Sequence, residues 1–218
     1  MYFPITVIDN FLNNFDELKN NVLNQNFKNR DILTMPGLAT DPLHILNIDY
    51  FKLSCNKILS TFFDRFNNIQ YNCISHFEKI IPYGQQYNKQ GWIHRDDNNL
   101  LSCIFYLQGD LEEGTSFFKK KNIGHFNNTL MPVKESLYRG DVVEPNFYNE
   151  KLKQHNSQFE LILKVPLIEN RIVIFDSSFF HCSDGYGNNE KPRIIQTSFF
   201  RTITGNVSFP IPEINRIN

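Results

Sequence analysis

The sequence predicts a mainly β fold of the α+β class: a double-stranded β-helix (jelly roll) buttressed by N-terminal helices. Two observations lead to this prediction. Residues 1–68 carry two apolar periodicities typical of helices, whereas residues 69–218 carry many short β-like runs separated by turn residues. A jelly roll arranges such strands in two facing sheets around an interior that can hold a ligand. We therefore expect one domain over residues 1–218, with helical support first and the jelly-roll core second.

Composition argues against several classes of protein. The 218 residues are 41% hydrophobic and include 21 phenylalanines, which is enough for a sizeable core. No stretch approaches the roughly 20 apolar residues that span a membrane. The net charge of −1 and the lack of a Lys/Arg stripe argue against a nucleic-acid partner. The four cysteines form no C-x-x-C pair and the N-terminal residues show no signal-peptide pattern, so we expect a reducing, cytoplasmic location.

The N-terminal part supplies the expected supports. Residues 3–8 alternate enough for a short opening strand. An amphipathic helix is expected from Asn14 to near Phe27, with Glu17 completing a capping box. A second helix is expected from about Asp49. We interpret both helices as laid against a sheet.

From residue 69 onward the pattern becomes β-rich. The expected strands are, in order, 69–77, 79–83, 100–107, 113–118, 159–165, 171–176 and 193–201. Residues 119–158 interrupt this series with a polar, Asn-rich insertion. Because so long a connection inside a compact domain usually has a function, we expect a loop or lid there, with a plain surface insertion as the alternative.

The strongest chemical signal is the stretch 92–96, Trp-Ile-His-Arg-Asp. Side chains two apart in an extended segment point to the same face, so His94 and Asp96 should lie together. Asp97 is the alternative carboxylate, but alternation turns it away from His94. His181 follows an apolar strand and is placed to supply a third ligand. Two histidines and one carboxylate with open positions form the arrangement used by non-haem Fe(II) oxygenases.

A second signal lies on the last expected strand, where Arg193, Ile195 and Thr197 share one face. An arginine that points into an apolar interior is costly unless an anion meets it. Its planar guanidinium matches a carboxylate in bidentate fashion. A dicarboxylate held by a metal at one end would need such an anchor at its other end.

The order of these motifs resembles the Fe(II)/2-oxoglutarate-dependent dioxygenases, and within them the prolyl-4-hydroxylase-like branch. The shared order is His-x-Asp, a Tyr-Leu strand, Gly-Thr-x-Phe, Asn-Arg-x-Val-x-Phe-Asp, a distal His and an Arg, over about residues 71–200. The resemblance implies that the iron ligands are His94, Asp96 and His181. It also implies that Arg193 and Tyr106 bind the distal carboxylate of 2-oxoglutarate.

Other cosubstrate contacts stay open at this stage. Tyr83 lies where the family often has a tyrosine facing the cosubstrate, and Tyr87 competes with it. The family's frequent Arg-x-Ser pattern has Ile195 in the third place, so this contact is missing unless Thr197 replaces it. Trp92 shares the face of His94, as a pocket wall or as a core residue. The remaining histidines are interpreted as surface or packing residues, although the last two lie in the insertion and could contact substrate: His44, His76, His125 and His155.

The resemblance implies an oxygenase that uses Fe(II), O2 and 2-oxoglutarate. It would release succinate and CO2 while hydroxylating a protein side chain or a small molecule, and the 119–158 insertion would decide which. Two alternatives stay open. One is a non-catalytic jelly-roll protein that binds a metal or ligand, and the other is a hydrolytic, cupin-like enzyme that has no need of Arg193.

Overall fold

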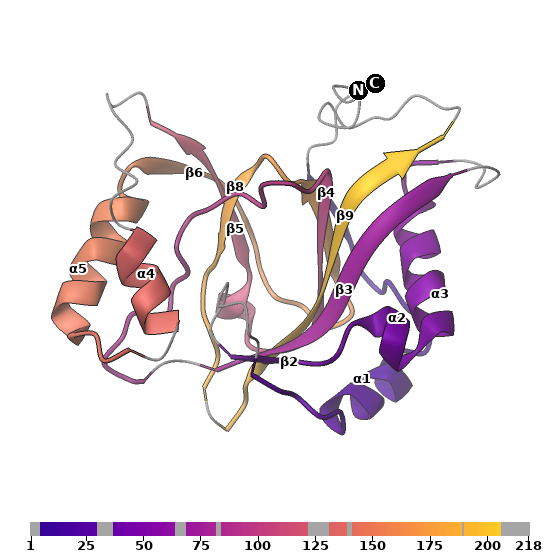
Figure 1. Ribbon diagram of the computed structural model, residues 1–218, viewed down its shortest axis with the longest axis horizontal. Helices are drawn as coiled ribbons and strands as arrows, with labels where there is room; N and C mark the ends of the chain where they lie inside the picture. Colours follow the sequence, from indigo (N-terminus) through magenta and orange to yellow (C-terminus); the bar gives the residue numbers. More distant parts are fainter. Residues whose placement is uncertain are drawn as a thin grey trace.

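The computed structural model describes residues 5–29, 37–63, 69–81, 84–121, 131–138, 141–188 and 190–205. Two antiparallel sheets face each other, with helices on their outer sides (Figure 1). The larger sheet contains, in spatial order, β1 (Ile5–Ile8), β7 (Ile172–Asp176), β4 (Leu101–Gln108), β9 (Arg193–Thr204), β3 (Gln70–Ile80) and β2 (Leu38–Ala39). The smaller sheet contains β6 (Phe159–Val165), β5 (Thr115–Lys120) and β8 (Phe180–Ser183). The mainly β jelly-roll class predicted from the sequence is confirmed.

The helices form two groups on opposite sides of the molecule (Figure 1). The first group is α1 (Phe15–Leu23), α2 (Leu43–Leu46) and α3 (Ile48–Leu59), and it covers the larger sheet. The second group is α4 (Met131–Tyr138) and α5 (Pro145–Asn156), and it lies beyond the smaller sheet. A short 3-10 helix, η1 (Leu111–Glu113), precedes β5. None of the described helices is long and apolar enough to cross a membrane.

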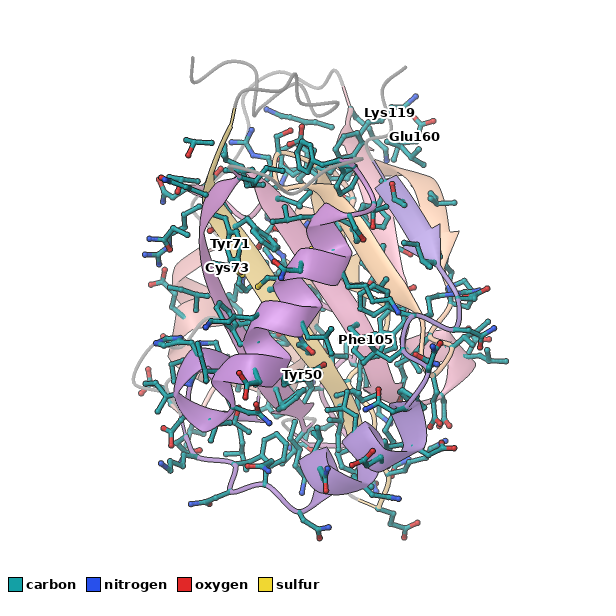
Figure 2. All side chains as sticks on the ribbon, turned by 90° about the vertical axis from the view of Figure 1, so that its right-hand side faces the viewer. Tyr50, Tyr71, Cys73, Phe105, Lys119 and Glu160 are labelled. Carbon is teal, nitrogen blue, oxygen red and sulfur yellow. The ribbon has the colours of Figure 1, made fainter. Side chains whose placement is uncertain are left out.

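The outer face of the larger sheet is buried beneath the first group of helices. Phe105 of β4 packs edge-on against Phe11 and Phe15, with ring centroids 5.4 and 6.0 Å apart. Ile58 of α3 is completely buried in the same cluster. Figure 2 views this side, where α3 runs across the sheet. Burial of each such side chain contributes roughly 1.5–3 kcal/mol, so these helices hold the sheet in shape.

A second apolar cluster fills the space between the two sheets. It joins side chains of the larger sheet, such as Tyr106, Phe175 and Ile195, to Phe117 of β5 and Val165 of β6. Phe117 and Phe175 stack edge-on across the gap, with centroids 5.0 Å apart. This interior is the space that a jelly roll offers to a ligand.

Several predicted boundaries are wrong in detail. The first helix ends at Leu23, before Phe27, and the side chain of Asn14 makes no capping hydrogen bond. The two strands expected over 69–83 are one strand, β3, because it pairs with β9 along its whole length. The start of the second helix, expected at about Asp49, is confirmed to within one residue: α3 begins at Ile48, where the Asn47 side chain accepts a hydrogen bond from the backbone N–H of Tyr50.

The insertion also differs from the loop that we expected over residues 119–158. Its described part contains the two helices α4 and α5. Helix α5 begins with Pro145, and the carboxylate of Glu144 accepts hydrogen bonds from the backbone N–H groups of Asn146 and Phe147, at 3.0 and 2.6 Å. The helix is mainly polar and buries few side chains, so its apolar periodicity is too weak to reveal it in the sequence.

Candidate metal centre

The structure brings His94, Asp96 and His181 together, with their ligand atoms all within 4.8 Å of one another. His94 Nε2 lies 3.7 Å from Asp96 Oδ1, and His181 Nε2 lies 3.5 Å from Asp96 Oδ2. One antiparallel bridge closes the long separation in sequence. The backbone N–H of His94 donates to the carbonyl of His181 at 3.0 Å, and the reverse bond is 2.9 Å. This isolated bridge lies in the extended segment that we expected around His94.

Both imidazoles are oriented by backbone carbonyls. His94 Nδ1 lies 2.8 Å from the carbonyl oxygen of Trp92, and His181 Nδ1 lies 3.0 Å from that of Phe179. A carbonyl oxygen can only accept, so each Nδ1 carries the proton and each Nε2 presents its lone pair to Asp96. Burial, with the neighbouring His181 and Lys134, lowers the pKa of His94 well below its usual value. His94 is therefore neutral at pH 7, the form that binds a metal.

The carboxylate of Asp96 is held by a buried hydroxyl pair. Ser102 Oγ donates to Asp96 Oδ2 at 2.7 Å, and Ser177 Oγ lies 2.7 Å from Ser102 Oγ. Asp97 instead has a side chain that is 74% exposed and lies 3.4 Å from Arg95. The structure therefore places Asp96, and not Asp97, beside the two histidines.

Arg193 lies in the interior with an incomplete set of partners. It is 2% exposed, and its Nε and Nη2 have no hydrogen-bond partner in the part of the chain that the structure describes. Its Cζ lies 5.8 Å from the ring centroid of Tyr106, whose hydroxyl donates to Thr115 Oγ1 at 2.8 Å. Asp184 is near enough to interact electrostatically with Arg193 but makes no ion pair with it within the described residues. A buried guanidinium with unpartnered N–H groups favours the approach of an anion.

The histidines and Arg193 border the same interior cluster. The ring of His181 lies 4.7 Å from that of Phe175 and 6.2 Å from that of Phe117. Both phenylalanines belong to the cluster that also contains Tyr106, which Arg193 overlies. His181 and Arg193 therefore border one apolar cluster between the two sheets.

Three other predicted contacts have different outcomes. Thr197 Oγ1 donates to Glu78 Oε1 at 2.8 Å, so its hydroxyl already has a partner, and its contact with a cosubstrate stays a prediction. Tyr83 lies outside the described residues. The hydroxyl of Tyr87 donates to the carbonyl of Val143 at 2.7 Å, which directs it toward the helices of the insertion.

Helix α5 is hydrogen-bonded to the backbone next to His94, a contact that the sequence did not reveal. His155 Nε2 donates to the carbonyl of Ile93 at 2.7 Å. Asn156 accepts from the N–H of Ile93 at 3.1 Å and donates to the carbonyl of Gly91 at 3.1 Å. Trp92, between these positions, donates through Nε1 to the hydroxyl of a buried tyrosine of α5 at 2.9 Å. Of the two interpretations left open for Trp92, the structure supports core packing.

Three of the histidines that the sequence left as packing or surface residues can be placed. His76 is half-buried in β3, and its Nδ1 lies 3.1 Å from the carbonyl oxygen of Thr40. His155 is 2% exposed and is a packing residue with a supporting role. His44 is exposed and packs edge-on against Phe51, with centroids 5.8 Å apart. His125, the other histidine of the insertion, lies outside the described residues.

The chain matches the model of one protein family. A model described as a family of unknown function, DUF6445, matches residues 2–190. The chain belongs to this family. A search of curated proteins finds none that matches this DUF6445 member.

Solved structures similar to this chain share its jelly-roll fold. HygX from Streptomyces hygroscopicus, with nickel and 2-oxoglutarate bound, has a TM-score of 0.55 at 7% identity, over 90% of this chain and 82% of HygX. EvdO2 from Micromonospora carbonacea var. aurantiaca has a TM-score of 0.55 at 15% identity, over 96% of this chain and 91% of EvdO2. The epimerase SnoN, in complex with Fe3+, alpha ketoglutarate and nogalamycin RO, has a TM-score of 0.53 at 9% identity, over 90% of this chain and 78% of SnoN.

These likenesses confirm the resemblance stated from the sequence at the level of the fold. The assignment to the prolyl-4-hydroxylase-like branch stays a prediction. At such low identities, the roles of individual residues rest on the geometry of this chain.

Proposed function

We propose that this protein is an Fe(II)- and 2-oxoglutarate-dependent oxygenase. The observation that carries the proposal is Arg193, a buried cation whose Nε and Nη2 have no partner among the described residues. Leaving a charged group unsatisfied costs more than leaving a neutral one, so the guanidinium favours an incoming carboxylate. It borders the same interior as the cluster of His94, Asp96 and His181. A dicarboxylate between the two sheets would satisfy both ends of this arrangement.

The three proposed ligands fit a ferrous ion by their chemistry. They would offer two neutral Nε2 atoms and one carboxylate, which leaves open positions for a cosubstrate and dioxygen. When bound, the ion supplies the redox chemistry that couples O2 to the decarboxylation of 2-oxoglutarate. The backbone bridge between His94 and His181 and the hydroxyl of Ser102 would fix the ligand geometry.

The other residues of the chain would bind the cosubstrate and exclude water. Arg193 would hold its distal carboxylate through two N–H groups. Tyr106 is the proposed second contact, and its hydroxyl would turn from Thr115 toward that carboxylate. The cluster of Phe117 and Phe175 would keep the interior dry, which strengthens each of these charge interactions. The overall reaction would convert a substrate C–H bond, O2 and 2-oxoglutarate into an alcohol, succinate and CO2.

The structural neighbours support this proposal by their fold. HygX was crystallised with nickel and 2-oxoglutarate, and SnoN with Fe3+ and alpha ketoglutarate. SnoN is an epimerase, so proteins of this fold can catalyse reactions other than hydroxylation. We propose hydroxylation of a protein side chain or a small molecule as the outcome for this chain. The cupin-like hydrolase gives no role to Arg193, and a non-catalytic binding protein has no need of Arg193 together with all three proposed metal ligands.

We further propose that residues 1–218 act as one domain in a reducing, cytoplasmic environment. The apolar cluster that joins α1 and α3 to β4 and β9 supports the first point. The second is supported by the four cysteines, which are buried free thiols: Cys55, Cys73, Cys103 and Cys182.

Succinate formation tests the proposed activity. The Fe(II)-loaded protein is supplied with 2-oxoglutarate and O2, and succinate is quantified for wild type, Asp96→Ala and Arg193→Met. We expect Asp96→Ala to lose at least about 100-fold in rate, and Arg193→Met to raise the KM for 2-oxoglutarate by about 10- to 100-fold. Asp97→Ala is the matched control and should keep the wild-type rate. Equal succinate formation by wild type and Asp96→Ala would refute the proposal.

A further inference from the structure

Strand β6 lies at an edge of the smaller sheet and has an exposed apolar centre. Among the described residues it pairs with β5 alone. Its three central side chains, 54%, 51% and 40% exposed, are Leu161, Ile162 and Leu163. Consecutive side chains of a strand point to opposite faces, so this apolar run is accessible from both faces of the sheet. Because an edge strand also presents unpaired N–H and C=O groups, β6 is a template for pairing with another strand.

Two exposed charges of opposite sign flank this apolar centre. The side chains of Glu160 and Lys164 are 56% and 44% exposed. Glu160 lies 3.2 Å from Lys119, and Lys164 lies 3.2 Å from Glu112 and 3.9 Å from Asp184. Because ion pairs between exposed side chains are weak, both charges can also pair with a neighbouring molecule. A strand that pairs with β6 should therefore carry the opposite charge at each of these two positions.

The sequence of β6 is complementary to itself about Ile162. The strand reads Phe-Glu-Leu-Ile-Leu-Lys-Val over Phe159–Val165. When two copies pair antiparallel about a two-fold axis at Ile162, Glu160 of each copy lies opposite Lys164 of the other, and apolar residues lie opposite apolar residues at every other position. A parallel pair in register would instead place like charges side by side. Pairs of opposite charge and pairs of apolar side chains both stabilise a sheet, and a two-fold interface requires a surface that complements itself.

We propose that a second copy of this chain pairs antiparallel with β6 across a two-fold axis at Ile162. The pairing joins the three-stranded sheets of the two copies into one continuous sheet. It covers the apolar centre of β6 and gives partners to the N–H and C=O groups of its open edge. The inference is independent of the proposed function, because β6 carries none of the proposed metal or cosubstrate residues.

Two features of β6 make this dimer a weak one. The ladder between β5 and β6 contains a bulge: Phe117 is paired with Leu163 and Phe118 with Leu161, so Ile162 has no partner in β5. A bulge bends its strand and disrupts pairing locally. The strand is also only 7 residues long. Interfaces of such small area are typical of reversible association.

Sedimentation equilibrium of the purified protein over a series of concentrations tests the pairing. We expect a reversible monomer–dimer equilibrium with a dissociation constant on the order of 10–100 µM, as suits a small interface. Ile162→Lys places two like charges opposite each other at the axis, so it should raise the dissociation constant at least about 10-fold. Ile45→Lys is the matched control, because Ile45 of α2 is 67% exposed and lies outside the smaller sheet. This variant should dimerise as wild type does.

Exchange of the two charges tests the antiparallel register. Glu160→Lys alone brings positive charges together, and Lys164→Glu alone brings negative charges together, so each should weaken the dimer about 10-fold. The double variant Glu160→Lys/Lys164→Glu restores opposite charges and should dimerise within about threefold of wild type.

Three results would overturn the inference. They are a wild type that stays monomeric up to about 500 µM, a dimer that Ile162→Lys does not weaken, and a double variant that dimerises no better than the single ones. Far-UV circular dichroism checks that each variant is folded. Ile162→Glu, which also places like charges at the axis, provides the same readout if Ile162→Lys does not fold.

Discussion

His155 of α5 and Ile93, next to the proposed metal ligand His94, are joined by a buried hydrogen bond of 2.7 Å. Ile93 directly precedes His94, and its N–H is held by Asn156 from the same helix. The insertion thus fixes the backbone that carries one proposed metal ligand. A helix outside the jelly roll is therefore hydrogen-bonded to the segment that carries His94.

We expect removal of this bond to loosen the metal centre. In His155→Leu the carbonyl of Ile93 is left without its buried donor, which costs about 1–3 kcal/mol of stability. Because His94 is then less firmly oriented, Co(II) affinity should fall by about 10-fold. Metal titration and urea unfolding measure the two effects. His44→Leu is the control, because His44 is an exposed histidine outside the metal centre. An unchanged Co(II) affinity in His155→Leu would show that the bond from His155 to Ile93 does not orient His94.

A second prediction concerns the hydrogen bond from Ser102 to Asp96. Ser102→Ala removes the donor to Asp96 Oδ2, so the carboxylate is free to rotate and Co(II) affinity should fall by about 10-fold. Ser75→Ala is the matched control, because Ser75 is also a buried strand serine but donates to the carbonyl of Thr197. Both variants should lose some stability, and only Ser102→Ala should lose metal affinity. Equal affinities in the two variants would contradict this account of Asp96.

Arg193 should have opposite effects on the free and the loaded protein. Its unpartnered Nε and Nη2 destabilise the free protein, so Arg193→Met should unfold at the same or a higher temperature than wild type. Co(II) with 2-oxoglutarate should raise the Tm of wild type well above the value with Co(II) alone. In Arg193→Met this additional rise should vanish. If 2-oxoglutarate raised the Tm of Arg193→Met as much as that of wild type, its distal carboxylate would have to bind at another residue.

The lowered pKa of His155 should make the free energy of unfolding depend on pH. Burial lowers its pKa in the folded protein below the usual 6.5, so the unfolded chain takes up a proton first as the pH falls. The free energy of unfolding should therefore be unaffected above about pH 6.5 and decrease below it, by at most about 1.4 kcal/mol per pH unit for this one proton. His94 acts in the same direction.

Urea unfolding of the metal-free protein at pH 7.5 and 5.5 measures that loss. His155→Gln lacks the titrating ring and should lose less stability between the two pH values than wild type. Parallel losses in both proteins would show that His155 does not carry this dependence.

The sequence revealed the parts of the site that follow from alternation and from order along the chain. His94 and Asp96 share a face because they are two apart, and the apolar strands around them indicate a sheet. The contribution of α5 could not be predicted in this way. His155 and Asn156 are more than 60 residues from the backbone that they hold, and polar residues in a polar helix look exposed until the helix is placed.

Other features depend on packing that no local pattern reports. Ser102 lies in an apolar strand, where a serine more often only fills space, and its bond to Asp96 depends on the turn between them. Lys134 resembles any solvated lysine of an insertion, and its burial follows from how α4 rests on Trp92. Asn14 illustrates the opposite case, because its capping motif is present in the sequence and the capping bond is not made.

A crystal structure of the protein with Co(II) and 2-oxoglutarate, grown without O2, tests the central claim most directly. The metal should be bound by Nε2 of His94, Nε2 of His181 and the carboxylate of Asp96. The distal carboxylate of 2-oxoglutarate should accept hydrogen bonds from Nε and Nη2 of Arg193. A metal bound elsewhere, or a 2-oxoglutarate whose distal carboxylate does not reach Arg193, would contradict the proposed oxygenase site.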